Sequence, residues 1–164
     1  MLVDVENRRR MMILHSIVVF LLWMLLSFML HELLPQKGGI EHPFFVFSMP
    51  FLLWFHFLFL VSGEVASILI ATSLHASVQP SLSFYQLVLF LVFLWPFLFF
   101  VFNRYFLSVL LLMLQWFCEL MVFAAYFAID KKAGLLFCPC IFWTSYLLYL
   151  SFIMWMKSTL LLGM

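Results

Sequence analysis

The sequence is dominated by five apolar runs, each long enough to cross a lipid bilayer. The runs cover residues 11–34, 44–73, 84–102, 105–129 and 135–156. A helix of about 20 apolar residues spans the ~30 Å hydrocarbon core of a membrane. Inside hydrocarbon, backbone N–H and C=O groups must find partners within the chain, and a helix supplies them. The sequence therefore predicts an all-α fold, in which residues 1–164 form a single domain: an integral membrane bundle of five transmembrane helices.

The connections between the runs are short, so neighbouring helices are expected to be antiparallel. Residues 35–39 and 74–83 have the composition of loops, and Asn103-Arg104 is a tight turn. Another turn, Asp130-Lys131-Lys132, is charged. The carboxylate of Asp130 is predicted to cap the fifth helix, because it can accept hydrogen bonds from the free N–H groups of the first turn.

The distribution of Lys and Arg predicts the orientation in the membrane. Five of these residues flank the runs on the N-terminal side and three flank them on the other side. They are Arg8, Arg9, Arg10, Lys131 and Lys132 against Lys37, Arg104 and Lys157. Cytoplasmic loops carry the excess of positive charge, so a cytoplasmic N-terminus is expected. The 23 phenylalanines suggest AT-rich codons and hence a bacterial cell membrane.

Composition excludes several classes of protein. The chain is 68% hydrophobic and 9% charged, whereas about a quarter of the residues of a soluble domain are charged. A formal net charge of +1 gives no basis for a nucleic-acid partner. The three cysteines lie in apolar runs, which argues against both a disulfide framework and a metal site. No phosphate-binding glycine loop, serine elbow or zinc-binding histidine pair is present, so no catalytic or metal-ligating residues are predicted.

Four polar residues fall inside the predicted spans: His56, Glu64, Gln115 and Glu119. Such residues face the interior of a bundle. Gln115 and Glu119 are four residues apart and share a helix face. Glu64 with His56 could hold a ligand carboxylate, a proton or a metal, and His56 could be an axial ligand of haem. Alternatively, these residues are hydrogen-bonded contacts between helices. The sequence leaves both interpretations open.

Tryptophans occur in the middle of three spans, at Trp54, Trp95 and Trp143. Tryptophan normally gathers at the membrane interfaces. Flat indole faces inside a bundle could line a slot for a planar ligand such as a porphyrin. Ordinary aromatic packing is the alternative, in a chain that is 21% aromatic.

Two segments carry a specific pattern. The first leads from the charged turn into the fifth run, and its matching positions are Asp130, Ala133, Pro139, Trp143, Ser145 and Leu150. The second is Leu94-Trp95-Pro96-Phe97-Leu98-Phe99-Phe100, followed by Asn103-Arg104 and Leu107. With a looser match over residues 42–66, these segments resemble the tryptophan-rich sensory protein family, also called the translocator protein family. Four positions depart from the family pattern: Val92 and Ser151 replace asparagines, Cys140 replaces a tyrosine and Leu147 replaces a small alanine.

The resemblance implies a membrane receptor or transport-like protein that binds porphyrins, sterol-like molecules or other planar hydrophobic ligands, without catalysis and without a required cofactor. The implied ligand site comprises Trp54, Trp95, Pro139, Trp143, Ser145, Leu147 and Ser151. A homodimer is also implied. Because the third run carries Leu91, Phe93, Phe97 and Phe99 where the family has small residues, the dimer interface is expected to be bulkier or weaker. The alternatives are a structural subunit of a larger membrane complex and an enzyme acting on a bound porphyrin.

Overall fold

The computed structural model describes residues 2–33, 49–75 and 77–162, and within these ranges it contains five helices long and apolar enough to cross a membrane. The elements are α1 (Leu2–Leu33), α2 (Met49–Ala71), α3 (Val78–Pro96), the short π-helix η1 (Phe97–Val101), α4 (Tyr105–Ile129) and α5 (Lys131–Leu162). The prediction of an all-α bundle with five transmembrane helices is confirmed. The chain is an integral, multi-pass membrane protein.

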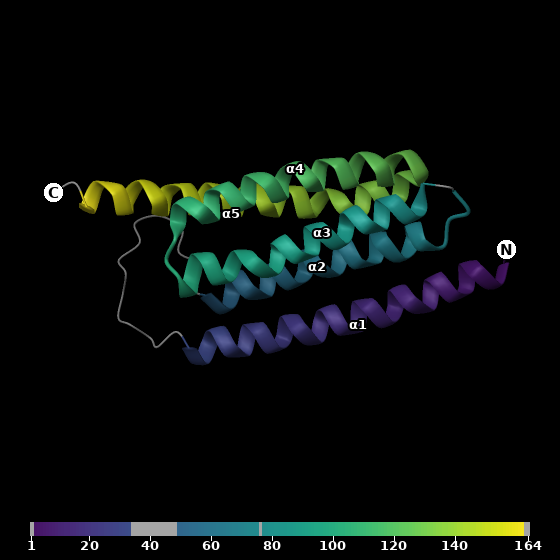
Figure 1. Ribbon diagram of the computed structural model, residues 1–164, viewed down its shortest axis with the longest axis horizontal. Helices are drawn as coiled ribbons and strands as arrows, with labels where there is room; N and C mark the ends of the chain where they lie inside the picture. The colour runs from purple at the N-terminus through teal and green to yellow at the C-terminus, as the bar shows by residue number, and fades with distance from the viewer. Residues whose placement is uncertain (1, 34–48, 76, 163–164) are drawn as a thin grey trace.

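The helices run alternately up and down, as Figure 1 shows. The helices α4 and α5 lie along one side, α2 and α3 occupy the middle, and α1 covers the opposite side. The most extensive packing is between α4 and α5, whereas α1 packs mainly on α2. The N-terminus, the connection from α2 to α3 and the turn from α4 to α5 share one end of the bundle (Figure 1).

Three helices begin earlier than the apolar pattern indicates. The third helix starts at Val78 rather than at residue 84. Pro80 is tolerated there, because N–H groups in the first helical turn have no acceptor within the helix. The first helix starts at Leu2 rather than at residue 11, and its polar turns are supported by Glu6, which contacts Arg9 at 3.9 Å and Arg10 at 3.2 Å. The fifth helix spans Lys131–Leu162 rather than 135–156.

The boundaries of the other two helices are closer to the prediction. The fourth helix has the predicted span, residues 105–129. The second begins at Met49 and ends at Ala71. Residues 44–48, which the sequence assigns to the second helix, lie outside the described residues.

The turn between α4 and α5 depends on Asp130 and Gly134. The Asp130 carboxylate accepts a hydrogen bond from the backbone N–H of Lys132 at 2.8 Å, which confirms the predicted cap. A Cβ atom at Gly134 would lie 2.8 Å from Cα of Phe127, so only glycine allows the two backbones to approach this closely. The helices α4 and α5 are therefore held together from their first shared turn.

The end of α3 is irregular because Pro96 has no N–H to donate within the helix. The next turn widens into η1, where the N–H of Phe102 bonds to the carbonyl of Phe97 at 2.9 Å. Asn103 then adopts a φ of 52°, which lies in the left-handed region. Asparagine tolerates this region better than most residues, and the chain reverses there into α4.

The bulky residues of α3 and η1 that the sequence assigns to a dimer interface pack largely inside the protomer. Leu91 is buried, Phe93 contacts the ring of Trp23, and Phe99 contacts the ring of Trp95. Phe97 also packs against the buried core. The exposed large side chains along α3 are instead Phe84, Leu87 and Phe90.

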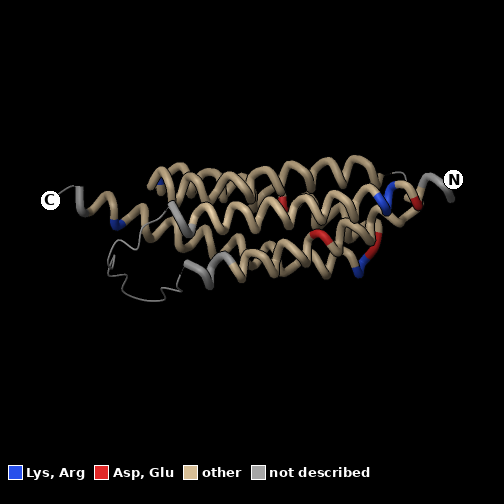
Figure 2. Tube along the Cα trace, turned by 90° about the horizontal axis from the view of Figure 1, so that it is seen from below, with Lys and Arg blue, Asp and Glu red and all other residues tan. Residues whose placement is uncertain are grey.

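Lys and Arg lie near the two ends of the bundle, as Figure 2 shows. We expect a cysteine placed at Ser77 or Lys132 to react with an impermeant maleimide from one side of the membrane, and a cysteine at Arg104 from the other. The native cysteines are first replaced by serine to remove background labelling. Gly39, which the sequence places on the side of Arg104, lies outside the described residues. Labelling of Ser77 and Arg104 positions from the same side would contradict the alternating topology.

Candidate functional site

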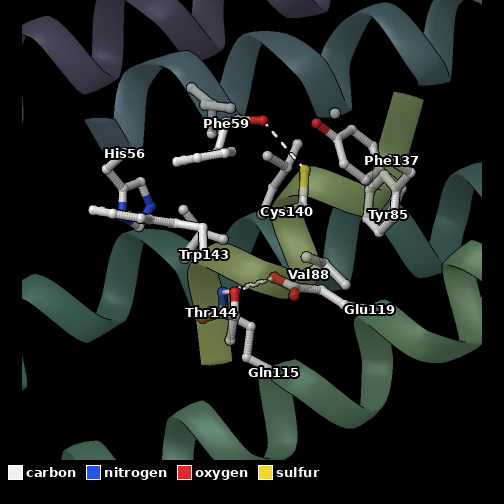
Figure 3. A pocket seen from close by; sticks show the side chains of 14 residues that line it. His56, Phe59, Tyr85, Val88, Gln115, Glu119, Phe137, Cys140, Trp143 and Thr144 are labelled. Atoms are coloured by element: carbon white, nitrogen blue, oxygen red, sulfur yellow. Dashed lines mark hydrogen bonds between the residues drawn. The ribbon is translucent and has the colours of Figure 1, made fainter. Parts of the chain in front are cut away.

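A small cavity of about 30 Å³ lies between α2, α3, α4 and α5. Its wall combines aromatic rings with polar groups, as Figure 3 shows. The lining residues are His56, Phe59, Leu60, Gly63, Tyr85, Val88, Leu89, Val92, Gln115, Glu119, Phe137, Cys140, Trp143 and Thr144. Pockets for drug-sized ligands have volumes of ~300–1,000 Å³, so this cavity holds water-sized groups unless its wall moves.

One wall of the cavity carries a triad of buried polar side chains: Gln115 and Glu119 from α4, and Thr144 from α5 (Figure 3). The Gln115 amide donates to Oε1 of Glu119 at 2.9 Å and to Oγ1 of Thr144 at 3.1 Å. The Thr144 hydroxyl donates to the same Glu119 oxygen at 2.8 Å. Oε2 of Glu119 and Oε1 of Gln115 have no hydrogen-bond partner among the described residues. Gln115 and Glu119 therefore share a helix face, as predicted, and each keeps one acceptor oxygen without a partner in the described part of the chain.

His56 is held by indole rings from three other helices. Its ring is stacked on Trp23 of α1 at 4.4 Å and on Trp95 of α3 at 6.1 Å between ring centroids. The indole N–H of Trp143 on α5 donates to Nδ1 of His56 at 3.0 Å. An indole nitrogen only donates, so Nδ1 is an acceptor and the imidazole carries its proton on Nε2. The ring is therefore fixed in both orientation and tautomer.

Four of the seven sequence-predicted site residues lie together. Trp95, Trp143 and Leu147 share one buried cluster with Leu112. The indole N–H of Trp95 donates to the hydroxyl of Ser151 at 3.3 Å. Because three of these residues come from α5 and the fourth from α3, the cluster joins the two helices beside the cavity.

The other three predicted residues lie elsewhere. Trp54 is 67% exposed and contacts the edge of Phe57. Ser145 lies on the exposed side of α5, where it accepts a hydrogen bond from the indole of Trp116 at 3.0 Å. Pro139 is half-buried within α5. Of all seven predicted residues, Trp143 alone is among those lining the cavity.

Glu64 belongs to a different site from His56, although the sequence pairs them. The Glu64 carboxylate is 1% exposed. It accepts hydrogen bonds from the hydroxyls of Ser16 on α1 at 2.5 Å and Tyr85 on α3 at 3.1 Å. Nδ1 of His15 lies 3.7 Å from it. Glu64 thus forms hydrogen-bonded contacts between helices, in agreement with the structural interpretation of this residue.

Cys140 joins α5 to α2 beside the cavity. Its thiol donates to the backbone carbonyl of Phe59 at 3.2 Å. One turn earlier, the hydroxyl of Ser62 donates to the carbonyl of Leu136. A Cβ atom at Gly63 would lie 3.4 Å from the Cys140 sulfur, so the helices are close here. The residue in the family's tyrosine position therefore has a packing role.

The described residues offer few ligands and little space for a metal ion or a haem. Within residues 2–33, 49–75 and 77–162, no group of three or more His, Cys, Asp or Glu residues is placed to hold a metal ion. Nδ1 of His56 is occupied by Trp143. The cavity that His56 lines is about 30 Å³, so a macrocycle at its other nitrogen requires rearrangement of the wall.

Comparison with known proteins decides the family. The family model described as the TspO/MBR family matches residues 40–156. The chain belongs to the TspO/MBR family. Curated protein sequences give no match. Membership of the TspO/MBR family supports, in general terms, a membrane role in binding or transporting sterol- or porphyrin-like molecules.

Several residues that shape the site of this TspO/MBR protein were missed by sequence reasoning. Trp23 lies outside the matched segment, yet it stacks on His56. Its position in the middle of an apolar run was the available signal. Thr144 completes the polar triad, but a single threonine in a membrane helix gives no signal of its own. Phe59, Tyr85 and Phe137 are indistinguishable in sequence from the other aromatic residues of the spans.

Proposed function

We propose that this TspO/MBR protein is a membrane receptor or transport-like protein that binds a planar hydrophobic ligand, with porphyrins as the principal class and sterol-like molecules as the second. The observation that carries the proposal is that Trp143 belongs both to the cavity wall and to the adjacent buried cluster. This residue lines the cavity, and it also packs with Trp95 and Leu147 in the adjacent buried cluster. Planar ligands bind by stacking on such rings.

Ligand binding requires the wall of the cavity to move, because the cavity measures about 30 Å³. The side chains best placed to move are those at the boundary between the cavity and the cluster. Leu147 is fully buried where the family has a small residue, so it occupies space that a ligand needs. We therefore propose that this chain binds porphyrins more weakly than relatives with the full pattern.

The experiment is a tryptophan-fluorescence titration of the purified protein with protoporphyrin IX in lipid nanodiscs. Saturable quenching in protein-containing discs, reduced by Trp143→Phe, supports the proposal. Quenching that is linear with added porphyrin, or unaffected by loss of Trp143, contradicts it. Trp54→Phe is the matched control, because Trp54 is exposed and lies away from the cavity.

The proposal also covers partners and orientation. We propose a homodimer in the membrane and no catalytic role. A cytoplasmic N-terminus is proposed from the positive residues Arg8, Arg9 and Arg10 together with Lys131 and Lys132. A bacterial cell membrane remains the proposed location. Light scattering in detergent measures the mass; a monomer at every concentration contradicts the dimer.

A structural subunit is the second candidate function. The observation that favours it is the close packing around His56, where three indole side chains and the cavity's small volume leave no ligand-sized space. Purification separates the two candidates: a ligand-binding protein is recovered as a small homo-oligomer, whereas a subunit is recovered with other chains bound.

A further inference from the structure

On the wall of the cavity, as far as the structure describes it, more hydrogen-bond acceptors than donors are left without a partner. Oε2 of Glu119 and Oε1 of Gln115 lack partners among the described residues, and these two side chains are 2% and 1% exposed. A buried acceptor without a partner is costly. A group that donates hydrogen bonds into this cavity therefore stabilises it.

The donors on the same wall are already used. Both N–H groups of Gln115 and the hydroxyl of Thr144 bond within the triad. The thiol of Cys140 donates to the Phe59 carbonyl, and the hydroxyl of Tyr85 donates to Glu64. The indole N–H of Trp143 donates to His56. What remains is the Nε2 proton of His56, so the wall offers a ligand more acceptors than donors.

The wall also has the charge and the rings that bind organic cations. None of the described residues lining the cavity is Lys or Arg, whereas Glu119 supplies a carboxylate. Four aromatic side chains surround the same space: Phe59, Tyr85, Phe137 and Trp143. The faces of aromatic rings attract ammonium groups, and aromatic cages are a common means of binding them. A ligand carboxylate at the same point would instead face Glu119.

We propose that this cavity binds the protonated amine of a ligand, with Glu119 as its counter-ion and the Gln115 carbonyl as a second acceptor. The amine binds as an ammonium ion to the ionised carboxylate of Glu119, the form in which Oε2 is an acceptor. The volume of about 30 Å³ fits such a head group. The proposal rests on the proposed function in one respect, namely that the cavity is a ligand site, and it adds the chemical class of the group bound there.

The test compares two probes of nearly equal size, 4-fluorobenzylamine and 4-fluorobenzyl alcohol, by fluorine NMR titration of the protein in phosphatidylcholine nanodiscs, with empty discs as background. The amine is expected to bind about tenfold more tightly than the alcohol, the ratio that one charge-assisted hydrogen bond supplies. Glu119→Gln is expected to bring the ratio close to one. Glu64→Gln removes another buried carboxylate, which does not line the cavity, and is expected to keep the preference.

Each outcome decides the proposal. A wild-type ratio near one overturns it, whether or not the variants fold. A preference that survives in Glu119→Gln also overturns it. If Glu119→Gln does not fold, Gln115→Met replaces it and is expected to lower the ratio severalfold; an unchanged ratio overturns the assignment.

The protoporphyrin titration of the same wild-type sample is scored separately. Saturable porphyrin quenching without amine preference leaves the proposed function intact and refutes this inference alone.

Discussion

Leu147→Ala is expected to destabilise the ligand-free protein and to strengthen its binding of protoporphyrin IX. Leu147 is 0% exposed and packs with Trp95, Leu112 and Trp143. Truncating a fully buried leucine to alanine costs roughly 2–5 kcal/mol of the free energy of unfolding, because a cavity remains. The same space lies beside Trp143, where the proposed ligand stacks.

The expected gain in affinity follows from the removal of excess bulk. Fitting additional methylene groups into a packed site costs about 1–3 kcal/mol. Relief of that cost corresponds to roughly a ten- to hundredfold lower Kd for porphyrin, since 1.4 kcal/mol equals a factor of ten. Thermal unfolding in detergent measures the first effect, and the fluorescence titration measures the second.

Two further variants make the result specific. Leu30→Ala is the matched control, because Leu30 is 1% exposed on α1, outside the cavity wall; it is expected to lower stability without raising affinity. Trp143→Phe is expected to weaken porphyrin binding, since it removes an indole ring and the hydrogen bond to His56. If neither Leu147→Ala nor Trp143→Phe changes the Kd, the ligand does not bind beside Trp143.

Glu64→Leu is expected to loosen α1 from the rest of the bundle. The carboxylate of Glu64 accepts hydrogen bonds from Ser16 on α1 and from Tyr85 on α3. Leucine has a similar size but no acceptor, so the buried Tyr85 hydroxyl is left without its partner. A buried polar group without a partner costs roughly 1–3 kcal/mol. Ser16 loses less, because its hydroxyl can still donate to the carbonyl of Met12 at 2.9 Å.

The measurements are thermal unfolding and hydrogen exchange of the α1 amides. Glu64→Leu should lower Tm by several degrees and raise exchange in α1 more than in α4 or α5, which pack extensively on each other. Glu64→Gln is the control, because its amide oxygen still accepts one of the two hydrogen bonds. Equal stability of the leucine variant and the wild type would show that the hydrogen bonds to Glu64 contribute nothing to the bundle.

The five helices could be located from the sequence, and so could four residues that lie together beside the cavity: Trp95, Trp143, Leu147 and Ser151. The five spans follow from a local requirement, since every helical turn inside the hydrocarbon must itself be apolar. The cap at Asp130 is also local, because donor and acceptor are two residues apart. The starts of α1 and α3 were misplaced, because Arg9, Arg10 and Pro80 resemble loop residues in composition although the first turns of a helix tolerate them.

The partners of the polar residues were decided by the tertiary structure. Nothing local pairs Trp143 with His56, 87 residues away, or Ser16 with Glu64, 48 residues away. His56 and Glu64 lie on the same helix, yet their hydrogen-bond donors come from different helices: α5 for His56, and α1 and α3 for Glu64. Packing likewise exposed Trp54 and buried Trp23, although both lie in apolar segments of similar composition.

The sequence by itself determined that this chain is a membrane bundle of five helices and pointed to its family, because hydrophobic length and motif spacing are properties of single segments. Only the tertiary structure decided which helix faces meet. In an almost uniformly apolar chain, sequence hydrophobicity does not distinguish the side of a helix that faces lipid from the side that faces its neighbours. That choice depends on shape and on the few polar groups that must find partners, and it is what places Glu119, Gln115 and Thr144 around one cavity.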